Sequence, residues 1–351
     1  MSLLSNFSKA AAGLALAAGL MATAIPATAM AAGPYTKDNP LKVVLVVHGT
    51  LGDKSFFDSA AAGLHQAEKD LPITLKIIEA TSDRSKWEPA LDDAADGGYD
   101  VVIAGTFEMI DFVAKIAPQY PDEKFITFDT VPDYTKCDCK NVLGIMYQTS
   151  SAGYLAGYAA AKLSKTGVLG TVVGMDFPTV TDFKVGFDQG AKAANPKINI
   201  LSQVAGTFID PAKGKEIALA QIGQGADVIF PIAGGTGIGS LQAVKDSGKL
   251  AVGVDSDQAS IFEATDPAQA AVIFTSVEKK VGQSLYLALK GTIDGTQEYG
   301  KGELLGLKEG AVGISKNKYY EKIVPADVRA EIDGLEKKIA SGEITVDTVM
   351  K

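Results

Sequence analysis

The sequence has only two histidines and two cysteines among its 351 residues, which limits the chemistry that it can perform. His48 and His65 lie far in the sequence from Cys137 and Cys139, so the four residues lack the spacing of a zinc site. The nucleophile elbow G-x-S-x-G, the phosphate-binding loop G-x-x-x-x-G-K-S/T and the pair H-E-x-x-H are all missing. The sequence therefore gives little support for catalysis, and we predict neither a metal nor a cofactor.

Basic residues are also scarce relative to acidic ones. The chain carries 33 Lys and Arg against 42 Asp and Glu, a formal net charge of −9. This balance disfavours nucleic acid and anionic lipid as partners. Long linkers and low-complexity segments are missing as well. The composition, 46% hydrophobic and 21% charged, is typical of a globular chain, and the length suits two domains.

The first residues have the pattern of a secretory leader. Lys9 is the only charged residue of segment 1–31, an apolar Ala- and Gly-rich stretch follows it, and Ala29-Met30-Ala31 fits a small-x-small cleavage site. The apolar run is short and only mildly apolar, which disfavours a membrane anchor. We predict cleavage after Ala31 and a soluble, periplasmic or extracellular protein.

One glycine-rich stretch, residues 226–258, organises the rest of the prediction. The apolar run at residues 228–232 predicts a buried parallel strand, and a second strand is expected to end at Asp255. Between the strands, Gly234 and Gly235 begin a helix and let backbone N–H groups approach a ligand. Open α/β sheets bind small ligands at such strand ends.

The same stretch comes close to a dinucleotide-binding fingerprint. Gly235 and Gly237 supply two of its glycines, and Asp255 lies twenty residues after Gly235. Ser240 stands where the third glycine is required, so this interpretation is disfavoured. Gly237 and Gly239 alternatively serve only to close the turn between strand and helix.

Strands and helices alternate along the whole chain, which predicts right-handed βαβ units and parallel sheets. Predicted strands cover residues 42–47, 73–79, 100–104, 124–129, 142–146, 167–173, 198–204, 228–232, 250–254 and 270–274. Predicted helices cover residues 54–69, 85–95, 109–116, 154–163, 181–194, 211–222, 277–289 and 326–341, and residues 304–315 are expected to be extended. Two lobes result, with chain crossings expected near residues 147–150, 272–276 and 304–312.

Polar and aromatic residues follow several predicted strands and are candidates for a cleft between the lobes. They lie in the segments 52–58, 105–111, 175–178 and 275–279, at Asp129, and at Asp255 and Asp257. Simpler roles stay open for some of them. Asp53 and Ser55 are also suited to cap a helix, Phe187 to fill the core, and Lys279 to lie on a solvated helix face. Cys137 and Cys139 are compatible with a tight disulfide or with two free thiols.

As a set in one order, several motifs resemble the basic membrane protein family of ABC-importer substrate-binding proteins, which includes purine-nucleoside receptors. The motifs are Asp53-Lys54-Ser55-Phe56, Tyr154-Leu155-Ala156-Gly157, Gly174-Met175-Asp176, Gly186-Phe187, Ala233-Gly234-Gly235-Thr236-Gly237, Gly253-Val254-Asp255-Ser256-Asp257-Gln258 and Thr275-Ser276. The resemblance covers nearly all of the chain after the leader. It implies the type I periplasmic binding protein fold, α/β, with two parallel-sheet three-layer lobes joined by three hinge crossings.

The resemblance also implies roles for individual residues. Purine receptors of the family stack the base between rings of the two lobes, which points to Phe56 and to Phe177 or Phe183. A first-lobe acid that recognises the base edge corresponds to Asp111. The ribose hydroxyls are held by residues that correspond to Asp255 and Lys279. The full set of predicted ligand-binding residues is Asp53, Ser55, Phe56, Asp111, Phe177, Phe183, Gly234, Gly235, Asp255 and Lys279.

Two positions depart from the family pattern. Phe57 stands where an Asn is usual, which removes an amide contact and affects the identity of the ligand. The lipid-attachment cysteine of many relatives is also missing, which alters anchoring only.

The sequence therefore predicts a monomeric, exported solute-binding protein without enzymatic activity. Its partners would be a small ligand, most simply a purine nucleoside, and an ABC permease. The alternatives are a secreted nucleotide-dependent enzyme and a ligand-sensing module of a membrane receptor. The predicted domains are a signal peptide at 1–31, a first lobe at 38–148 plus 276–306, and a second lobe at 149–275 plus 307–351.

Overall fold

A computed structural model of the chain describes residues 34–350. The leader predicted at residues 1–31 lies outside the described residues. Among residues 34–350, no helix has the length and apolarity needed to cross a membrane.

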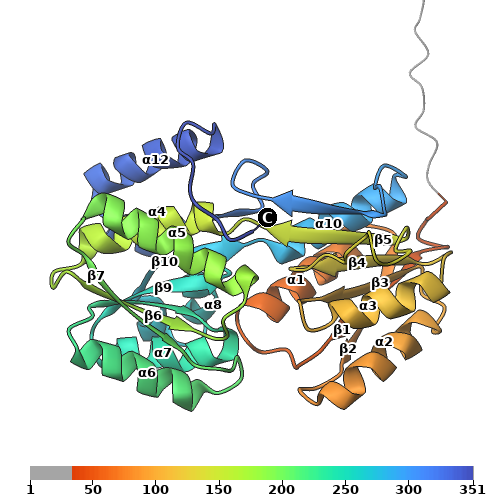
Figure 1. Cartoon of the computed structure of the whole chain (residues 1–351), viewed down its shortest axis with the longest axis horizontal. Helices are drawn as coiled ribbons and strands as arrows, with labels where there is room; N and C mark the ends of the chain where they lie inside the picture. Colours follow the sequence, from red (N-terminus) through yellow and green to blue (C-terminus); the bar gives the residue numbers. More distant parts are fainter. Residues whose placement is uncertain (1–33, 351) are drawn as a thin grey trace, which may run out of the picture. The chain divides into compact units, whose positions relative to one another are not determined.

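The first lobe is a six-stranded parallel sheet with helices on both faces (Figure 1). Its elements are β1 (Leu41–Val47), α1 (Phe56–Asp70), β2 (Ile73–Glu79), α2 (Trp87–Ala95), β3 (Val101–Gly105), α3 (Ile110–Ile116), β4 (Lys124–Phe128), β5 (Val142–Tyr147), α10 (Val281–Ile293) and β11 (Lys301–Leu305), with short 3-10 helices at Arg84–Lys86 and Ala117–Gln119. The strand order is β11-β5-β4-β3-β1-β2. Every neighbouring pair is parallel, as predicted.

The second lobe repeats this plan, with α4 and α5 on one face of its sheet and α6 and α7 on the other (Figure 1). Its elements are α4 (Ser150–Leu163), β6 (Val168–Val173), α5 (Pro178–Ala194), β7 (Asn199–Val204), α6 (Pro211–Gly223), β8 (Val228–Ile232), α7 (Gly234–Asp246), β9 (Leu250–Asp255), α8 (Gln258–Glu263), α9 (Pro267–Ala270), β10 (Ile273–Lys279), β12 (Val312–Ile314), α11 (Lys318–Ile323) and α12 (Ala326–Ala340). The strand order is β12-β10-β9-β8-β6-β7. Only the β10–β12 pair is antiparallel.

The almost continuously apolar sequence of strand β1 is explained by the packing on both faces of its sheet. Val43, Leu45 and Val47 belong to a core cluster that includes residues of α1 and α10. Val44 and Val46 belong to a second cluster, with residues of α2 and α3. Because successive side chains of a strand point to opposite faces, a sheet covered on both sides needs apolar residues at every position. The three-layer build predicted for the lobe is confirmed.

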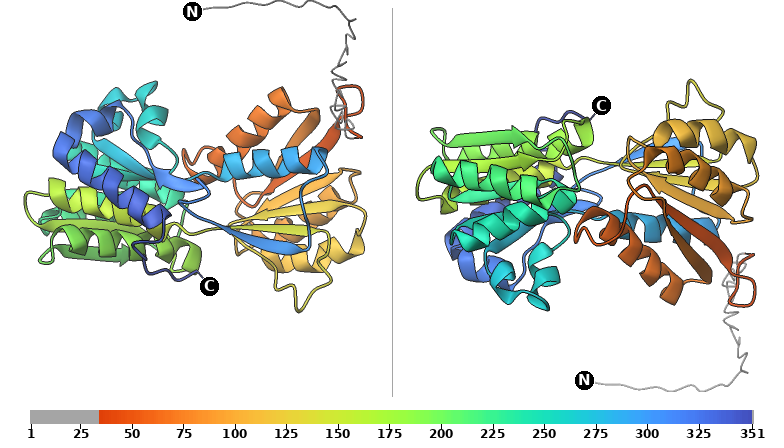
Figure 2. Two further views of the ribbon diagram at one scale, coloured as in Figure 1. Left: turned by 90° about the horizontal axis from the view of Figure 1, so that it is seen from above. Right: turned by 90° about the horizontal axis from the view of Figure 1, so that it is seen from below.

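The chain passes between the two sheets three times, and the passages are best seen in Figure 2. The first follows β5, the second follows β10, and the third joins β11 to β12. The passages are paired by backbone hydrogen bonds. Gln148 N–H donates to the Leu305 carbonyl, and Lys280 N–H donates to the Ala311 carbonyl, both at 2.9 Å.

The position of the second passage differs from the prediction. Residues 275–279 were expected to begin a helix after a crossing near 272–276. They instead continue strand β10 as far as Lys279, and the crossing comes at Lys280. The reason is that β9 and β12 hydrogen-bond to this segment from both sides. Residues 276–279 therefore belong to the sheet of the second lobe.

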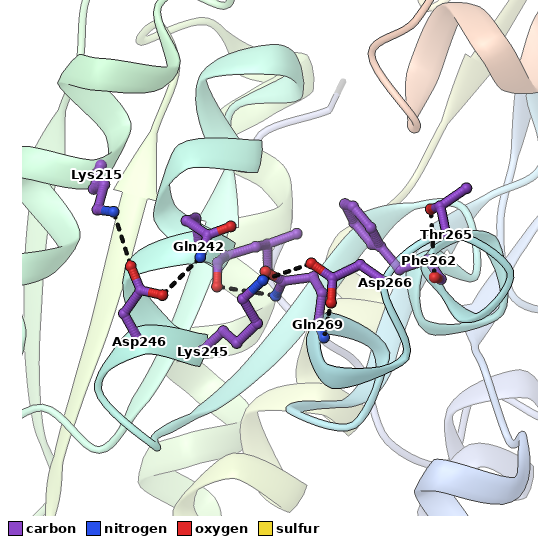
Figure 3. Close-up of polar contacts among 9 residues, drawn as sticks. Lys215, Gln242, Lys245, Asp246, Phe262, Thr265, Asp266 and Gln269 are labelled. Carbon is purple, nitrogen blue, oxygen red and sulfur yellow. Dashed lines mark hydrogen bonds and ion pairs between the residues drawn. The ribbon is translucent and has the colours of Figure 1, made fainter.

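The organising stretch has the predicted arrangement of strand, helix and strand. Helix α7 is tied to its neighbours by side-chain contacts, with Lys215 bound to Asp246, and Lys245 to Asp266 (Figure 3). Gln269 donates from its side chain to the Leu241 carbonyl at 2.9 Å. A Cβ at Gly239 would lie 1.7 Å from the carbonyl oxygen of Pro211, so this glycine allows α6 and α7 to pack closely.

Other differences from the prediction arise from local or tertiary capping. Helix α4 begins at Ser150 rather than at residue 154, because the Asp182 carboxylate accepts a hydrogen bond from Ser150 N–H at 2.7 Å. Helix α5 begins at Pro178, which suits a first helical position. The short helices α8, α9 and α11 were not predicted. Each has only four to six residues, which is too short to show the repeating pattern of apolar residues by which a helix is recognised. Cys137 and Cys139 form a disulfide.

Candidate ligand-binding site

A cavity of about 490 Å³ lies between residues that follow strands of both sheets. The first lobe contributes His48, Gly49, Thr50, Leu51, Gly52, Asp53, Phe56, Phe57, Ser82, Trp87, Thr106, Phe107, Glu108 and Asp129. The second lobe contributes Met175, Thr179, Val180, Phe183, Gly206, Thr207, Phe208, Ile209, Pro211, Ile232, Ala233, Gly234, Gly235, Ile238, Val254, Asp255 and Lys279. Cavities of this size hold small organic molecules.

One wall of the cavity contains an ion cluster formed by Asp129, Asp255 and Lys279, which we call the carboxylate–lysine cluster. Lys279 Nζ lies 2.9 Å from Asp129 Oδ1 and 3.7 Å from Asp255 Oδ1. Asp255 Oδ2 accepts a hydrogen bond from the Ser55 hydroxyl at 2.7 Å. Lys279 and Asp255 come from the second lobe, whereas Asp129 and Ser55 come from the first. The cluster therefore joins the lobes as well as lining the cavity.

Burial controls the electrostatics of this cluster. Loss of solvent raises the pKa of Asp255, and the nearby Lys279 ammonium opposes that rise. Burial alone would lower the pKa of Lys279, but the Asp129 and Asp255 carboxylates outweigh it and the pKa is raised. Asp255 Oδ1 is buried without a hydrogen-bond donor among the described residues. It is therefore an acceptor available to a ligand.

The backbone at the two aspartates is unusual. Asp129 and Asp255 have φ values of +60° and +63°, in the left-handed region that most side chains avoid. They follow β4 and close β9, the places where the chain leaves each sheet. Strained backbone of this kind persists when the surroundings hold it, and it is concentrated at functional sites.

Aromatic rings from both lobes surround the ammonium group of Lys279. Its Nζ lies 4.6 Å from the centre of the Phe56 ring and 5.1 Å from that of Phe183. Phe208 adds a second ring of the second lobe, and its ring packs over Gly174, where a Cβ would lie 2.3 Å from it. The cavity thus offers flat apolar surfaces beside a charged cluster.

A second polar group lies on the first-lobe wall. His48 Nε2 lies 2.9 Å from Glu108 Oε2 and 3.2 Å from Thr106 Oγ1. His48 follows β1, and the other two residues follow β3. The ring of His48 packs edge-on against Phe57 and Trp87.

Asp53 lines the cavity but also caps helix α1. Its carboxylate accepts hydrogen bonds from the backbone N–H groups of Ser55, Phe57 and Asp58, at 3.0, 2.9 and 3.1 Å. These donors lie at the start of the helix, where backbone N–H groups lack partners within the helix. The capping role left open by the sequence is therefore present.

The pKa of Asp53 gives a pH prediction. Burial raises this pKa to about 6, although the backbone donors favour the ionised form. Between pH 3.8 and about 6 the folded protein holds a proton that the unfolded chain has lost. The contribution of Asp53 to stability therefore falls as pH rises through this range. Urea unfolding between pH 4 and 7 should show wild type losing stability relative to Asp53→Asn. Equal pH slopes for the two proteins would contradict the prediction.

The structure brings together most of the predicted ligand-binding residues. Seven of them line the cavity, namely Asp53, Phe56, Phe183, Gly234, Gly235, Asp255 and Lys279. Ser55 does not line it but supports Asp255 through the hydrogen bond described above. For Phe187, the sequence left open whether the side chain fills the core. Phe187 is fully buried, and the centre of its ring lies 5.1 Å from that of Phe230.

Asp111 and Phe177 are not brought to the cavity. Asp111 is exposed in the first turn of α3, and Glu108, which precedes that helix, is the acid that lines the cavity. Phe177 stacks on Phe107 instead, with ring centres 3.6 Å apart and planes at 23°. The stack joins the loop after β3 to the start of α5 and hence links the two lobes.

The Phe107–Phe177 stack predicts an effect on ligand release. Separation of the lobes must break the stack, because each ring belongs to a different lobe. Stacked aromatic pairs contribute about 0.5–1.5 kcal/mol beyond their buried area. Phe177→Ala should therefore speed ligand dissociation by about two- to tenfold at 1.4 kcal/mol per decade. Stopped-flow fluorescence can measure this rate, with Phe112→Ala, a ring that does not line the cavity, as control. An unchanged rate in Phe177→Ala would contradict the prediction.

Two residues that line the cavity, His48 and Phe208, were not predicted, and Asp129 was predicted to face the cleft but was not included in the ligand-binding set. His48 immediately follows a predicted strand, so the strand-end rule alone would have pointed to it. Phe208 had no such signal. It lies beyond β7, an edge strand with mostly exposed side chains, and only the folded chain brings it to Gly174 and Gly234.

Sequence comparison matches most of the chain to a family profile and to known proteins. The sequence profile described as "ABC transporter substrate-binding protein PnrA-like" matches residues 41–349. Basic membrane protein A of Borreliella burgdorferi is 34% identical over 309 residues, which cover 87% of each chain. Its counterpart in Borreliella afzelii is 33% identical over 309 residues, 87% of this chain and 91% of that protein.

A solved structure shares the arrangement of the two lobes. The crystal structure of an ABC transporter system solute-binding protein from Aeropyrum pernix K1 superposes with a TM-score of 0.79 at 27% identity. The match covers 89% of this chain and 94% of that one. The predicted type I periplasmic binding protein fold is confirmed.

Proposed function

This chain belongs to the PnrA-like ABC transporter substrate-binding proteins, and from that premise we propose that its ligand is a purine nucleoside. The nucleoside is bound between the lobes without being chemically altered and is delivered to an ABC permease. One observation carries the proposal above all others. A buried carboxylate oxygen of Asp255 that accepts no hydrogen bond among the described residues lies 3.7 Å from the Lys279 ammonium group, which itself lies 4.6 Å from the centre of the Phe56 ring.

The carboxylate–lysine cluster suits the hydroxyl end of a nucleoside. A carboxylate accepts hydrogen bonds from hydroxyl groups, and an ammonium group donates to their oxygens. Asp255 Oδ1 supplies the first function, and Lys279 supplies the second while staying paired with Asp129. Such charge-assisted hydrogen bonds are stronger than those between neutral groups.

The aromatic rings suit the planar end of the ligand. Phe56 of the first lobe and Phe208 of the second line the cavity and are our candidates for stacking on a base, whereas Phe183 also lines it but is only 1% exposed. Phe208 replaces Phe177 as a candidate, because the ring of Phe177 is occupied by Phe107. Stacking of this kind tolerates any flat ring, so hydrogen-bonding groups must supply the choice of base.

The proposal includes where the protein acts. We propose that the predicted leader at residues 1–31 is removed on export, and that the mature protein is a periplasmic or extracellular monomer. Its partners are the ligand and the permease of an importer. The alternative, a secreted nucleotide-dependent enzyme, would differ from a binding protein by turning the bound ligand into a product.

Mass spectrometry of small molecules released from the purified protein tests the proposal. We expect a purine nucleoside in nearly stoichiometric amount. Incubation with added nucleosides should return them unchanged. A carried ligand without both a planar ring and hydroxyl groups, or cleavage of the added nucleoside, would overturn the assignment.

A further inference from the structure

Gln258 is buried between the two lobes but does not line the cavity. Its side-chain amide has one hydrogen-bond partner in each lobe. Oε1 accepts from Val254 N–H at 3.0 Å, and Nε2 donates to the Lys54 carbonyl at 3.1 Å. Val254 lies in β9 of the second lobe, whereas Lys54 precedes α1 of the first. Gln258 therefore connects the end of β9 to the first lobe.

The two partners fix the orientation of the amide. A backbone N–H only donates and a backbone carbonyl only accepts, so the amide oxygen must face Val254 and the amide nitrogen must face Lys54. The main chain is held as well, because Gln258 N–H donates to Ser276 Oγ at 3.2 Å. A Cβ at Gly253 would lie 3.0 Å from Gln258 Oε1 and 2.3 Å from Ser276 Oγ, so a glycine is needed there for this close approach.

The end of β9 depends on this support. Its ladder with β8 pairs only residues 250 and 251 of β9. Asp255 closes the strand with φ +63°, a backbone conformation that persists only where the surroundings hold it. Gln258 binds the N–H of the residue immediately before Asp255. It therefore helps to hold the backbone from which the Asp255 carboxylate reaches the cavity.

Two further hydrogen bonds join the same segments of the two lobes. The Ser55 hydroxyl donates to Asp255 Oδ2 at 2.7 Å, and the Ser256 hydroxyl donates to the Ser55 carbonyl at 3.0 Å. We call Lys54, Ser55, Asp255, Ser256 and Gln258 the interlobe clasp. Within the interlobe clasp, the carboxylate of Asp255 is held by one residue and its backbone by another.

We propose that Gln258 is a positioning residue for ligand binding, which acts through Asp255. The inference rests on the proposed function, in which Asp255 Oδ1 accepts a hydrogen bond from a hydroxyl group of the nucleoside. Such a bond requires its acceptor within a narrow range of distance and angle. Without the amide, the end of β9 is free to shift and the sugar is held less well. The base is affected little, because aromatic rings hold it.

Gln258→Met should weaken inosine binding by about three- to thirtyfold, less than removal of the Asp255 carboxylate itself. Methionine is unbranched and flexible, but it lacks the donor and has only a weak acceptor. Binding of hypoxanthine, the free base of inosine, should stay close to that of wild type.

Gln269→Met is the matched control. Gln269 is 2% exposed, and its amide donates to the Leu241 carbonyl within the second lobe, away from the residues that line the cavity. This control should lower the melting temperature, because it also removes a buried hydrogen bond. It should leave the affinity for inosine unchanged, which a purely structural role of Gln258 would also do.

A double variant separates positioning from a general weakening of the site. In Asp255→Ala the carboxylate is already gone, so adding Gln258→Met should weaken inosine binding little further. Gln258→Ala keeps the test decisive if the methionine variant does not fold. Its small side chain leaves room for a water molecule to bridge Val254 N–H and the Lys54 carbonyl. A water holds the strand end less firmly than the amide, so Gln258→Ala should also bind inosine more weakly than wild type.

The experiment is calorimetric titration of these proteins, freed of carried ligand, with inosine and hypoxanthine, and melting temperatures check folding. Three results would each overturn the inference while leaving the proposed function intact. They are unchanged inosine binding in the Gln258 variants, equal weakening of inosine and hypoxanthine, and a full further loss in the double variant. If wild type binds neither compound, the proposed function fails, and this inference fails with it.

Discussion

Replacing Lys279 by methionine should destabilise the folded protein by about 3–5 kcal/mol, the usual cost of removing one partner of a buried ion pair. Lys279 is 3% exposed, and its ammonium group compensates both Asp129 and Asp255. The variant would leave two buried carboxylates close together without a cation. The loss should shrink as pH falls, because protonation of the carboxylates removes the uncompensated charge.

Urea unfolding at neutral and acidic pH measures this effect. Lys280→Met is a matched control, because Lys280 is the next residue and its side chain is 37% exposed. Its Nζ lies 4.0 Å from Glu278 Oε2. We expect this control to change stability by less than about 1 kcal/mol, as is usual for an exposed pair. Similar losses for the two variants would contradict a structural role of the carboxylate–lysine cluster.

Asp255→Ala should weaken nucleoside binding by about ten- to hundredfold, at 1.4 kcal/mol per decade. The ligand hydroxyls would lose their acceptor in a closed cavity, where each unpaired group costs about 1–3 kcal/mol. Binding of a free purine base should change far less, because a base has no ribose to hold. Calorimetric titration with nucleoside and base, for wild type and variant, measures the difference.

Asp257→Ala is the control for Asp255→Ala. Asp257 follows the same strand but caps α8, accepting a hydrogen bond from Ser260 N–H at 3.2 Å. It does not line the cavity. We expect this variant to bind nucleosides normally. Equal weakening of base and nucleoside by Asp255→Ala would contradict the ribose assignment.

The fold could be predicted from the sequence because its main signals are local. Apolar strands such as β1 and β8 are covered on both faces. Helix α6 begins through neighbouring residues alone, because Pro211 suits the first helical position and the Asp210 side chain accepts a hydrogen bond from Lys213 N–H. The start of α4 could not be predicted in this way, because its cap is Asp182, a residue of another helix.

Strand β10 shows a second limit of prediction. A helix was predicted over residues 277–289, whereas Ile273–Lys279 is a strand and the helix begins at Val281. The conformation of this strand is decided by β9 and β12, which the sequence places tens of residues away. The error moved a crossing by several residues but left Lys279 at the cavity.

Residues that line the cavity because they lie at the ends of strands could be predicted. Residues that reach the cavity through tertiary packing could not. Asp255 and Gly234 follow strands and lie at the cavity, as expected for parallel sheets. Glu108 lies in a segment predicted to face the cleft, but the family resemblance pointed to Asp111, which is exposed in the first turn of α3 and does not line the cavity. Phe208 reaches the cavity through contacts with glycines of other elements, which no local pattern encodes.

The most direct test of the central claim is calorimetric titration of the ligand-free protein with inosine at two temperatures. We predict one nucleoside bound per chain, with a negative heat-capacity change because the rings and the base bury apolar surface together. The carried ligand must first be removed by unfolding and refolding. Absence of binding by inosine, guanosine and adenosine alike, in a protein that has regained its native melting temperature, would contradict the account.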